Sequence, residues 1–199
     1  MKKKLLLLII CLLLISLPLF SYTVLYAEQY YRLYHRHFYM YPDATMENMV
    51  WLERSLNADF CNPLYALAEI ANENEWEHYR FLFKMHVNLK LVELHLILAN
   101  GYDKQVAYFY NYPWKEENLE SLEIAEELYK TGLYYWEQAK IWASKLVNSR
   151  HHLDDVQNWE DEKYRIFAGD LNYEEIIFEH LTRLYQVRAD FEAMDENTY

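Results

Sequence analysis

The sequence is poor in glycine, proline and cysteine, with 3, 4 and 2 of these residues among 199. Tight turns depend on glycine and proline, so this scarcity argues against a many-stranded sheet and favours long helices with brief connections. Three glycines are also too few for phosphate-cradling or dinucleotide-binding loops. Of the cysteines, Cys11 lies near the N-terminus, and Cys61 is either a half-buried bystander or a thiol that pairs with another chain.

Positive charge is scarce as well. The chain has 19 Lys and Arg against 31 Asp and Glu, which gives a formal net charge of −12. Binding to a phosphate backbone requires a basic face, so we expect no nucleic-acid partner. The same charge disfavours adsorption to an anionic membrane surface.

The N-terminus has the layout of a bacterial secretory signal. Three lysines at residues 2–4 precede an apolar run from Leu5 to Phe20. We therefore expect export to the periplasm or cell envelope, with residues 1–21 removed and the charge moved from −12 to −15 by the loss of those lysines. The run from Leu5 to Ala27 is also long enough for an uncleaved inner-membrane anchor, which would be the only membrane contact.

Apolar residues spaced three or four apart predict helices along nearly the whole of a domain at 22–194, followed by a loose tail at 195–199. The expected fold is all-α, with stacked antiparallel helix pairs. Trp76–Leu98 is apolar on most sides and is expected at the centre. The other predicted helices are Tyr22–Met40, one from Thr45 to Leu56, Leu64–Ala71, a short one ending at Tyr110, Glu116–Lys130, Leu133–Val147, 156–168 and 172–192.

The three glycines fall at predicted turns between helices. Gly101, Gly132 and Gly169 are 31 and 37 residues apart, which brackets the 34-residue period of tetratricopeptide repeats. The local matches to that family are Ser55 and Asp59 within Trp51–Pro63, the Leu67-Ala68 pair, the set Ala125, Gly132 and Tyr134, and the helix opening Tyr173–Ile176.

On these matches the chain resembles a degenerate tetratricopeptide array. The resemblance implies a right-handed superhelix whose concave face binds a segment of a partner protein. Phe60 stands where the family has proline, Ala139 arrives two residues late, and Arg80 and Lys84 occupy positions expected in the core.

No residue set predicts an enzyme, a cofactor or a metal centre. Glu75-x-x-His78 has the spacing of helical di-iron sites, but those sites need a second such motif. His151 and His152 stand near two aspartates in a connector that collects such residues by chance. His86 and His95 lie in the apolar central helix, where hydrogen-bonded core histidines are more common than ligands. We assign no catalytic, cofactor-binding or metal-binding residues.

Aromatic residues are abundant, with 20 Tyr, 9 Phe and 6 Trp. Tyrosine and tryptophan anchor protein interfaces, so we expect a scaffold or adaptor that binds other envelope proteins. The resemblance to exported tetratricopeptide-like proteins implies a subunit of a large periplasmic assembly, such as a flagellar motor collar. Packing between helices is the alternative role of each residue, and a small-ligand-binding protein or a membrane-anchored accessory factor are the alternative functions. The predicted protein-binding residues are Tyr108, Tyr110, Tyr112, Trp114, Tyr134, Tyr135 and Trp136.

Overall fold

The structure of the protein, a computed structural model, describes residues 23–104 and 110–197. In chain order the elements are α2 (Ala27–Met40), α3 (Thr45–Asn57), η1 (Pro63–Tyr65), α4 (Glu73–Asn100), η2 (Tyr112–Trp114), α5 (Lys115–Ser144), η3 (Asp154–Val156), α6 (Gln157–Ala168) and α7 (Tyr173–Ala193). The only β-type pairing in these ranges is an isolated bridge between Tyr26 and Asp59. The predicted all-α class is confirmed.

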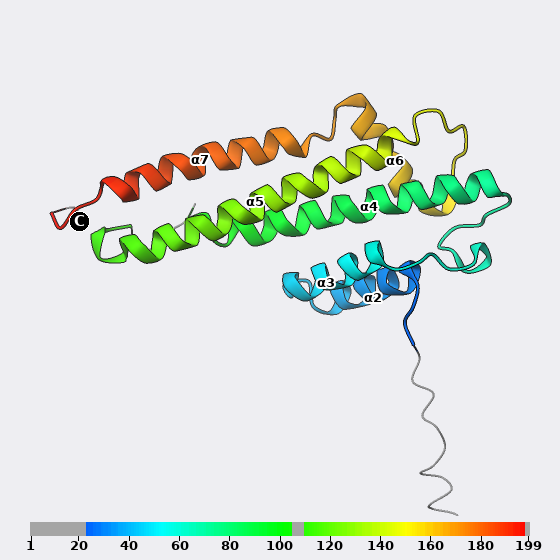
Figure 1. The fold of residues 1–199 in the computed structure, drawn as a ribbon, viewed down its shortest axis with the longest axis horizontal. Coiled ribbons are helices and arrows are strands. Elements are labelled where there is room, and N and C mark those ends of the chain that lie inside the picture. The colour runs from blue at the N-terminus through cyan, green and yellow to red at the C-terminus, as the bar shows by residue number, and fades with distance from the viewer. Residues whose placement is uncertain (1–22, 105–109, 198–199) are drawn as a thin grey trace, which may run out of the picture.

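Three long helices, α4, α5 and α7, lie side by side, and each runs antiparallel to the next (Figure 1). The shorter α2 and α3 form a hairpin, and both of its helices contact α4, while α6 packs near one end of α4. No helix within the described ranges is both long and apolar enough to cross a membrane. The predicted signal or anchor at 1–21 lies outside the described residues.

Helix α4 is the centre of the molecule, as its apolar pattern predicts. The Asn72 side chain caps its first turn by accepting a hydrogen bond from the Glu75 N–H at 3.0 Å. Buried side chains occur on most sides of the helix, since α3, α5 and α6 pack against it. Its observed bounds exceed the predicted range Trp76–Leu98 by only a few residues at either end.

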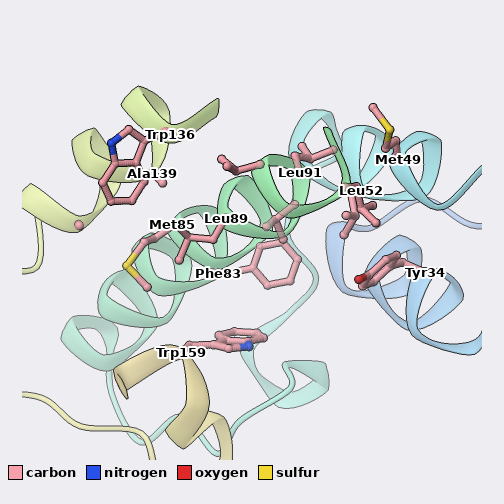
Figure 2. Packing of buried hydrophobic residues seen from close by; sticks show 14 of the residues in the cluster. Tyr34, Met49, Leu52, Phe83, Met85, Leu89, Leu91, Trp136, Ala139 and Trp159 are labelled. Atoms are coloured by element: carbon pink, nitrogen blue, oxygen red, sulfur yellow. The ribbon is translucent and has the colours of Figure 1, made fainter. Parts of the chain in front are cut away.

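One hydrophobic core joins all six helices (Figure 2). Leu52 of α3 and Tyr34 of α2 lie on one side of α4, and Trp136 of α5 lies on another. The ring of Trp159 in α6 stands edge-on to Phe83 of α4, with centroids 5.6 Å apart. Many of the aromatic residues therefore pack in the core. Each aromatic ring pair stabilises the fold by about 0.5–1.5 kcal/mol beyond the effect of the buried area.

The predicted helix break at Gly132 is wrong. Helix α5 continues through this residue without interruption. A Cβ at Gly132 would lie 3.5 Å from His95 Cβ and 3.7 Å from Ile177 Cδ1. The glycine therefore lies where α4 and α7 approach α5 closely, and tertiary packing outweighs its low helix propensity.

The predicted helix at 64–71 is also wrong, because only the short η1 forms there. Side chains distant in sequence bond the backbone of this segment instead. The Leu67 N–H donates to the Tyr79 hydroxyl at 3.2 Å, and the Glu69 N–H donates to Asp155 Oδ2 at 2.8 Å. These partners satisfy N–H groups that a helix would otherwise pair with its own carbonyls.

Helix α2 begins at Ala27, later than the predicted start at Tyr22, and the other helix boundaries agree closely with the prediction. Gly101 follows the end of α4, and Gly169 ends α6 in the left-handed conformation with φ 79°. The short helix predicted before Tyr110 is not seen at 101–104, which form a turn, and residues 105–109 lie outside the described ranges. Helix α7 ends at Ala193, close to the predicted tail. Two features of the tetratricopeptide resemblance, the turn at Gly132 and the helix at 64–71, do not form in the structure. The rest of the resemblance stays a prediction.

Candidate functional site

The structure separates the predicted protein-binding residues into two groups. Tyr110, Tyr112 and Trp114 lie at the N-terminal end of α5, whereas Tyr134, Tyr135 and Trp136 lie about 30 Å further along that helix. Tyr108 lies outside the described residues. The seven side chains therefore do not form one surface.

In the first group, Tyr110 packs against the C-terminal end of α7. Its ring lies 4.3 Å from that of Phe191, and its hydroxyl donates to Asp190 Oδ2 at 3.4 Å. Tyr112 is half-buried and Trp114 is exposed. Packing between helices accounts for Tyr110, whereas Trp114 is 42% exposed.

In the second group, Trp136 is a core residue and cannot belong to an exposed surface. Its side chain is only 2% exposed, and its ring stands edge-on to Tyr173 of α7 at 5.6 Å. The indole points between α5 and α7, whereas its neighbour Tyr134 is 57% exposed. The helical turn therefore puts these near neighbours on different faces.

Tyr134 and Tyr135 line a groove between α3 and α5 with α4 as its floor. Its volume is about 310 Å³. Positions four apart give each helix one lining face. The lining residues are Glu53, Leu56 and Asn57 of α3, Lys84 and Asn88 of α4, and Tyr134, Tyr135, Gln138 and Trp142 of α5.

One hydrogen bond connects the two walls of this groove. The Tyr135 hydroxyl donates to Glu53 Oε1 at 3.2 Å, and burial together with the Glu53 charge raises the pKa of Tyr135. The ring of Tyr134 stands edge-on to Tyr135 at 5.3 Å. Tyr135 therefore holds the groove together, and Tyr134 is left free to contact a ligand.

Two further cations, Lys145 and Arg80, lie near Lys84, the cation that lines the groove. Lys84 Nζ lies 4.4 Å and Lys145 Nζ 3.9 Å from the centre of the Trp142 ring. The guanidinium of Arg80, one turn before Lys84, lies 5.8 Å from the Trp76 ring centre. Burial, together with the neighbouring Lys145 and Arg80 charges, lowers the pKa of Lys84.

The buried carboxylate of Glu160 is satisfied within the protein. It accepts hydrogen bonds from His78 at 2.8 Å, from Lys163, and from the Leu153 N–H at 3.1 Å. Burial alone would raise the pKa of Glu160, but the bonds from His78 and Lys163 lower it to about 2. This set stabilises the junction of α4 and α6.

The two histidine motifs of the sequence meet beside this carboxylate. His151 Nδ1 lies 3.8 Å from Glu75 Oε1, and its ring centre lies 6.2 Å from that of His78. In the part of the chain that the structure describes, no three His, Cys, Asp or Glu side chains are arranged to hold a metal ion. As predicted, His86 and His95 are hydrogen-bonded core residues.

A second pocket, of about 370 Å³, lies beside Cys61 at the start of α2. Its lining includes Glu28 and Arg32. Burial and the adjacent Glu28 carboxylate raise the pKa of the Cys61 thiol to about 12. A thiol with so high a pKa is a poor nucleophile at neutral pH.

The fold and the groove describe an all-α protein with an aromatic surface between a helical hairpin and a long helix pair. Residues 74–194 match the family described as Domain of unknown function (DUF8513), and the chain belongs to that family. Comparisons with curated proteins and with solved structures gave no match. The family segment contains the α4 floor and the α5 wall of the groove, whereas the α3 wall lies before it.

Proposed function

We propose that this protein is a scaffold or adaptor of the bacterial cell envelope that binds a segment of a partner protein in the groove between α3, α4 and α5. The observation that carries the proposal is the placement of Tyr134 and Trp142 along a groove of about 310 Å³. Aromatic side chains of this kind supply much of the binding energy at protein interfaces.

The chemistry of the lining suits a polypeptide. Tyr134 and Trp142 offer apolar faces, while Asn57, Asn88 and Gln138 offer amide groups that can pair with a peptide backbone. A chain with a net charge of −12 is a poor partner for nucleic acid. A groove open between two walls also accommodates a continuous chain that enters and leaves.

The compartment rests on the basic and apolar residues 1–21 alone. An exported scaffold with a groove of this kind would suit a structural subunit of a large periplasmic assembly, such as the collar of a flagellar motor. The pocket beside Cys61 supports the alternative of a protein that binds a small ligand. An uncleaved N-terminus would instead make the protein an inner-membrane-anchored accessory factor.

Affinity capture tests the proposal. The full chain, tagged at its C-terminus, is recovered from envelope extract of the native cells, and the bound proteins are identified by mass spectrometry. We expect a small, reproducible set of envelope proteins that is lost with Tyr134→Ala. Tyr164→Ala is the matched control, because Tyr164 of α6 is 54% exposed but lies outside the groove.

Capture of the same partners by wild type and Tyr134→Ala would show that the binding surface lies outside the groove. Empty capture by folded wild-type protein would contradict the scaffold function and favour the ligand-binding alternative. Cell fractionation with N-terminal sequencing of the recovered chain decides between a cleaved signal and an intact anchor.

A further inference from the structure

We propose that Lys84 of this groove, together with the neighbouring Lys145 and Arg80, binds carboxylate side chains of an acidic segment in the partner protein. This inference rests on the proposed protein-binding function and specifies the chemistry of the segment. It starts from the pairing of charges in the molecule.

Most cations on the long helices have a carboxylate partner. Lys90, Lys130, Lys140, Arg183 and Arg188 each form an ion pair, as does Lys163 of α6. Arg80, Lys84 and Lys145 form none with any carboxylate in residues 23–104 and 110–197, although acids outnumber bases 31 to 19 in the chain. Other cations of the described residues, such as Arg36 of α2 and Arg165 of α6, also form no ion pair, so what distinguishes these three is that they lie close to one another.

The aromatic rings hold these cations together against their mutual repulsion. Lys84 and Lys145 both lie over Trp142, and Lys145 also lies 5.3 Å from the centre of the Phe81 ring. Cation–π contacts of this length are favourable. The neighbouring positive charges still help to lower the pKa of Lys84, so an added negative charge would relieve a cost that the folded protein bears.

A structural role explains only part of this arrangement. Lys145 is the C-cap residue of α5, where the helix dipole favours a cation. Arg80 and Lys84 lie about two and three turns after the N-terminal residue of α4, where the helix dipole does not favour a cation.

The charged residues that line the groove differ between its sides. Glu53 is the only carboxylate among its lining residues, and its Oε1 accepts the hydrogen bond from Tyr135. Lys84 and Trp142 lie on the α4 and α5 sides of the same groove. The fitting occupant is therefore an extended segment in which acidic side chains alternate with apolar ones, the acids on Lys84 and Lys145 and an apolar group on Tyr134.

Fluorescence anisotropy with a labelled eight-residue peptide of alternating glutamate and leucine tests this directly. A peptide with glutamine in place of glutamate is the matched probe. In low salt we expect the full chain to bind the glutamate peptide at least tenfold more tightly, and added NaCl to remove the difference. The double variant Lys84→Gln, Lys145→Gln should lose at least tenfold in affinity, whereas Arg36→Gln, at an exposed cation of α2, should lose none.

Each other outcome has a defined meaning. Equal binding of both peptides, lost with Tyr134→Ala, would overturn the carboxylate site and leave the protein-binding groove standing. No binding of the glutamate peptide by folded protein would overturn the inference, and affinity capture would still decide the proposed function. Displacement by inorganic phosphate, but not by NaCl of equal ionic strength, would assign the cations to phosphate instead. Self-association that depends on Lys84 would assign them to a second copy of the chain.

Discussion

The hydroxyl of Tyr135 donates a hydrogen bond to Oε1 of Glu53 at 3.2 Å, although the two residues are 82 positions apart in the chain. Glu53 belongs to the N-terminal hairpin, and Tyr135 belongs to the second half of α5. The bond therefore connects two parts of the molecule that otherwise meet mainly through α4. It fixes the distance between the walls of the groove.

Removal of this bond is expected to lower stability modestly. The variant Tyr135→Phe keeps the ring and loses the donor, so the free energy of unfolding should fall by about 1 kcal/mol in urea titration. Tyr134→Phe is the control, because no hydrogen bond of its hydroxyl holds the walls together, and we expect no change. An equal loss in both variants would contradict the assigned role of the Tyr135 hydroxyl.

The two glycines at positions 132 and 169 should respond in opposite ways to alanine. At Gly132 a Cβ meets its neighbours at ordinary contact distances, so Gly132→Ala should raise the free energy of unfolding by up to about 1 kcal/mol. Gly169 has φ 79°, so Gly169→Ala should lower it by roughly 1–2 kcal/mol. Thermal and urea unfolding measure both. Destabilisation by Gly132→Ala would indicate that α4 and α7 pack too closely around this residue to accept a methyl group.

Acid should weaken the junction of α4 and α6 through Glu160. Its pKa falls from an ordinary 4.5 to about 2 in the folded protein, because His78 and Lys163 outweigh the effect of burial. The folded chain therefore binds this proton less readily than the unfolded chain. The resulting stabilisation is complete above about pH 4.5 and declines as the pH falls toward about 2.

The variant Glu160→Gln leaves Lys163 buried without its carboxylate and should cost about 3–5 kcal/mol at pH 7. Its stability should also fall less steeply than that of wild type between pH 4.5 and pH 2. Glu69→Gln, at an exposed carboxylate, is the control and should follow the wild-type curve. Parallel acid curves for wild type and Glu160→Gln would show that this carboxylate is not the coupled group.

Cys61 should react slowly with thiol reagents while the protein is folded. Its side chain is buried, and its pKa is raised to about 12, so little thiolate exists at pH 8. In a Cys11→Ser variant, Cys61 is the only thiol, and its reaction with a chromogenic disulfide should accelerate by orders of magnitude in denaturing urea. Rapid reaction in buffer alone would contradict the buried position.

The helices whose residues lie on clear apolar patterns could be predicted from sequence, and those that depend on distant partners could not. Asn72 and the apolar residues of α4 specify that helix locally, and Gly169 specifies the end of α6. The segment at 64–71 has a helical pattern, but Tyr79 and Asp155 bond its backbone instead. The sequence predicts a turn at Gly132, because the helices that pack around this glycine are brought together only by the fold.

The candidate site was predictable in part for the same reason. The density of aromatic residues indicated Tyr134 and Tyr135, but it could not separate exposed Tyr134 from buried Trp136. Trp142 follows Tyr134 at two successive four-residue steps, a spacing that could have indicated the groove. Lys84 was visible only as a mismatch to a repeat pattern, since its neighbour Lys145 lies on another helix.

The division of the groove between α3 and the family segment has an evolutionary consequence. The α3 wall contributes Glu53, Leu56 and Asn57, which precede the family match at 74–194. Mutations on that exposed edge can alter which sequences the groove accepts while the packing of α4, α5 and α7 stays the same. Relatives that share the long helices but differ in the hairpin would then bind different partners.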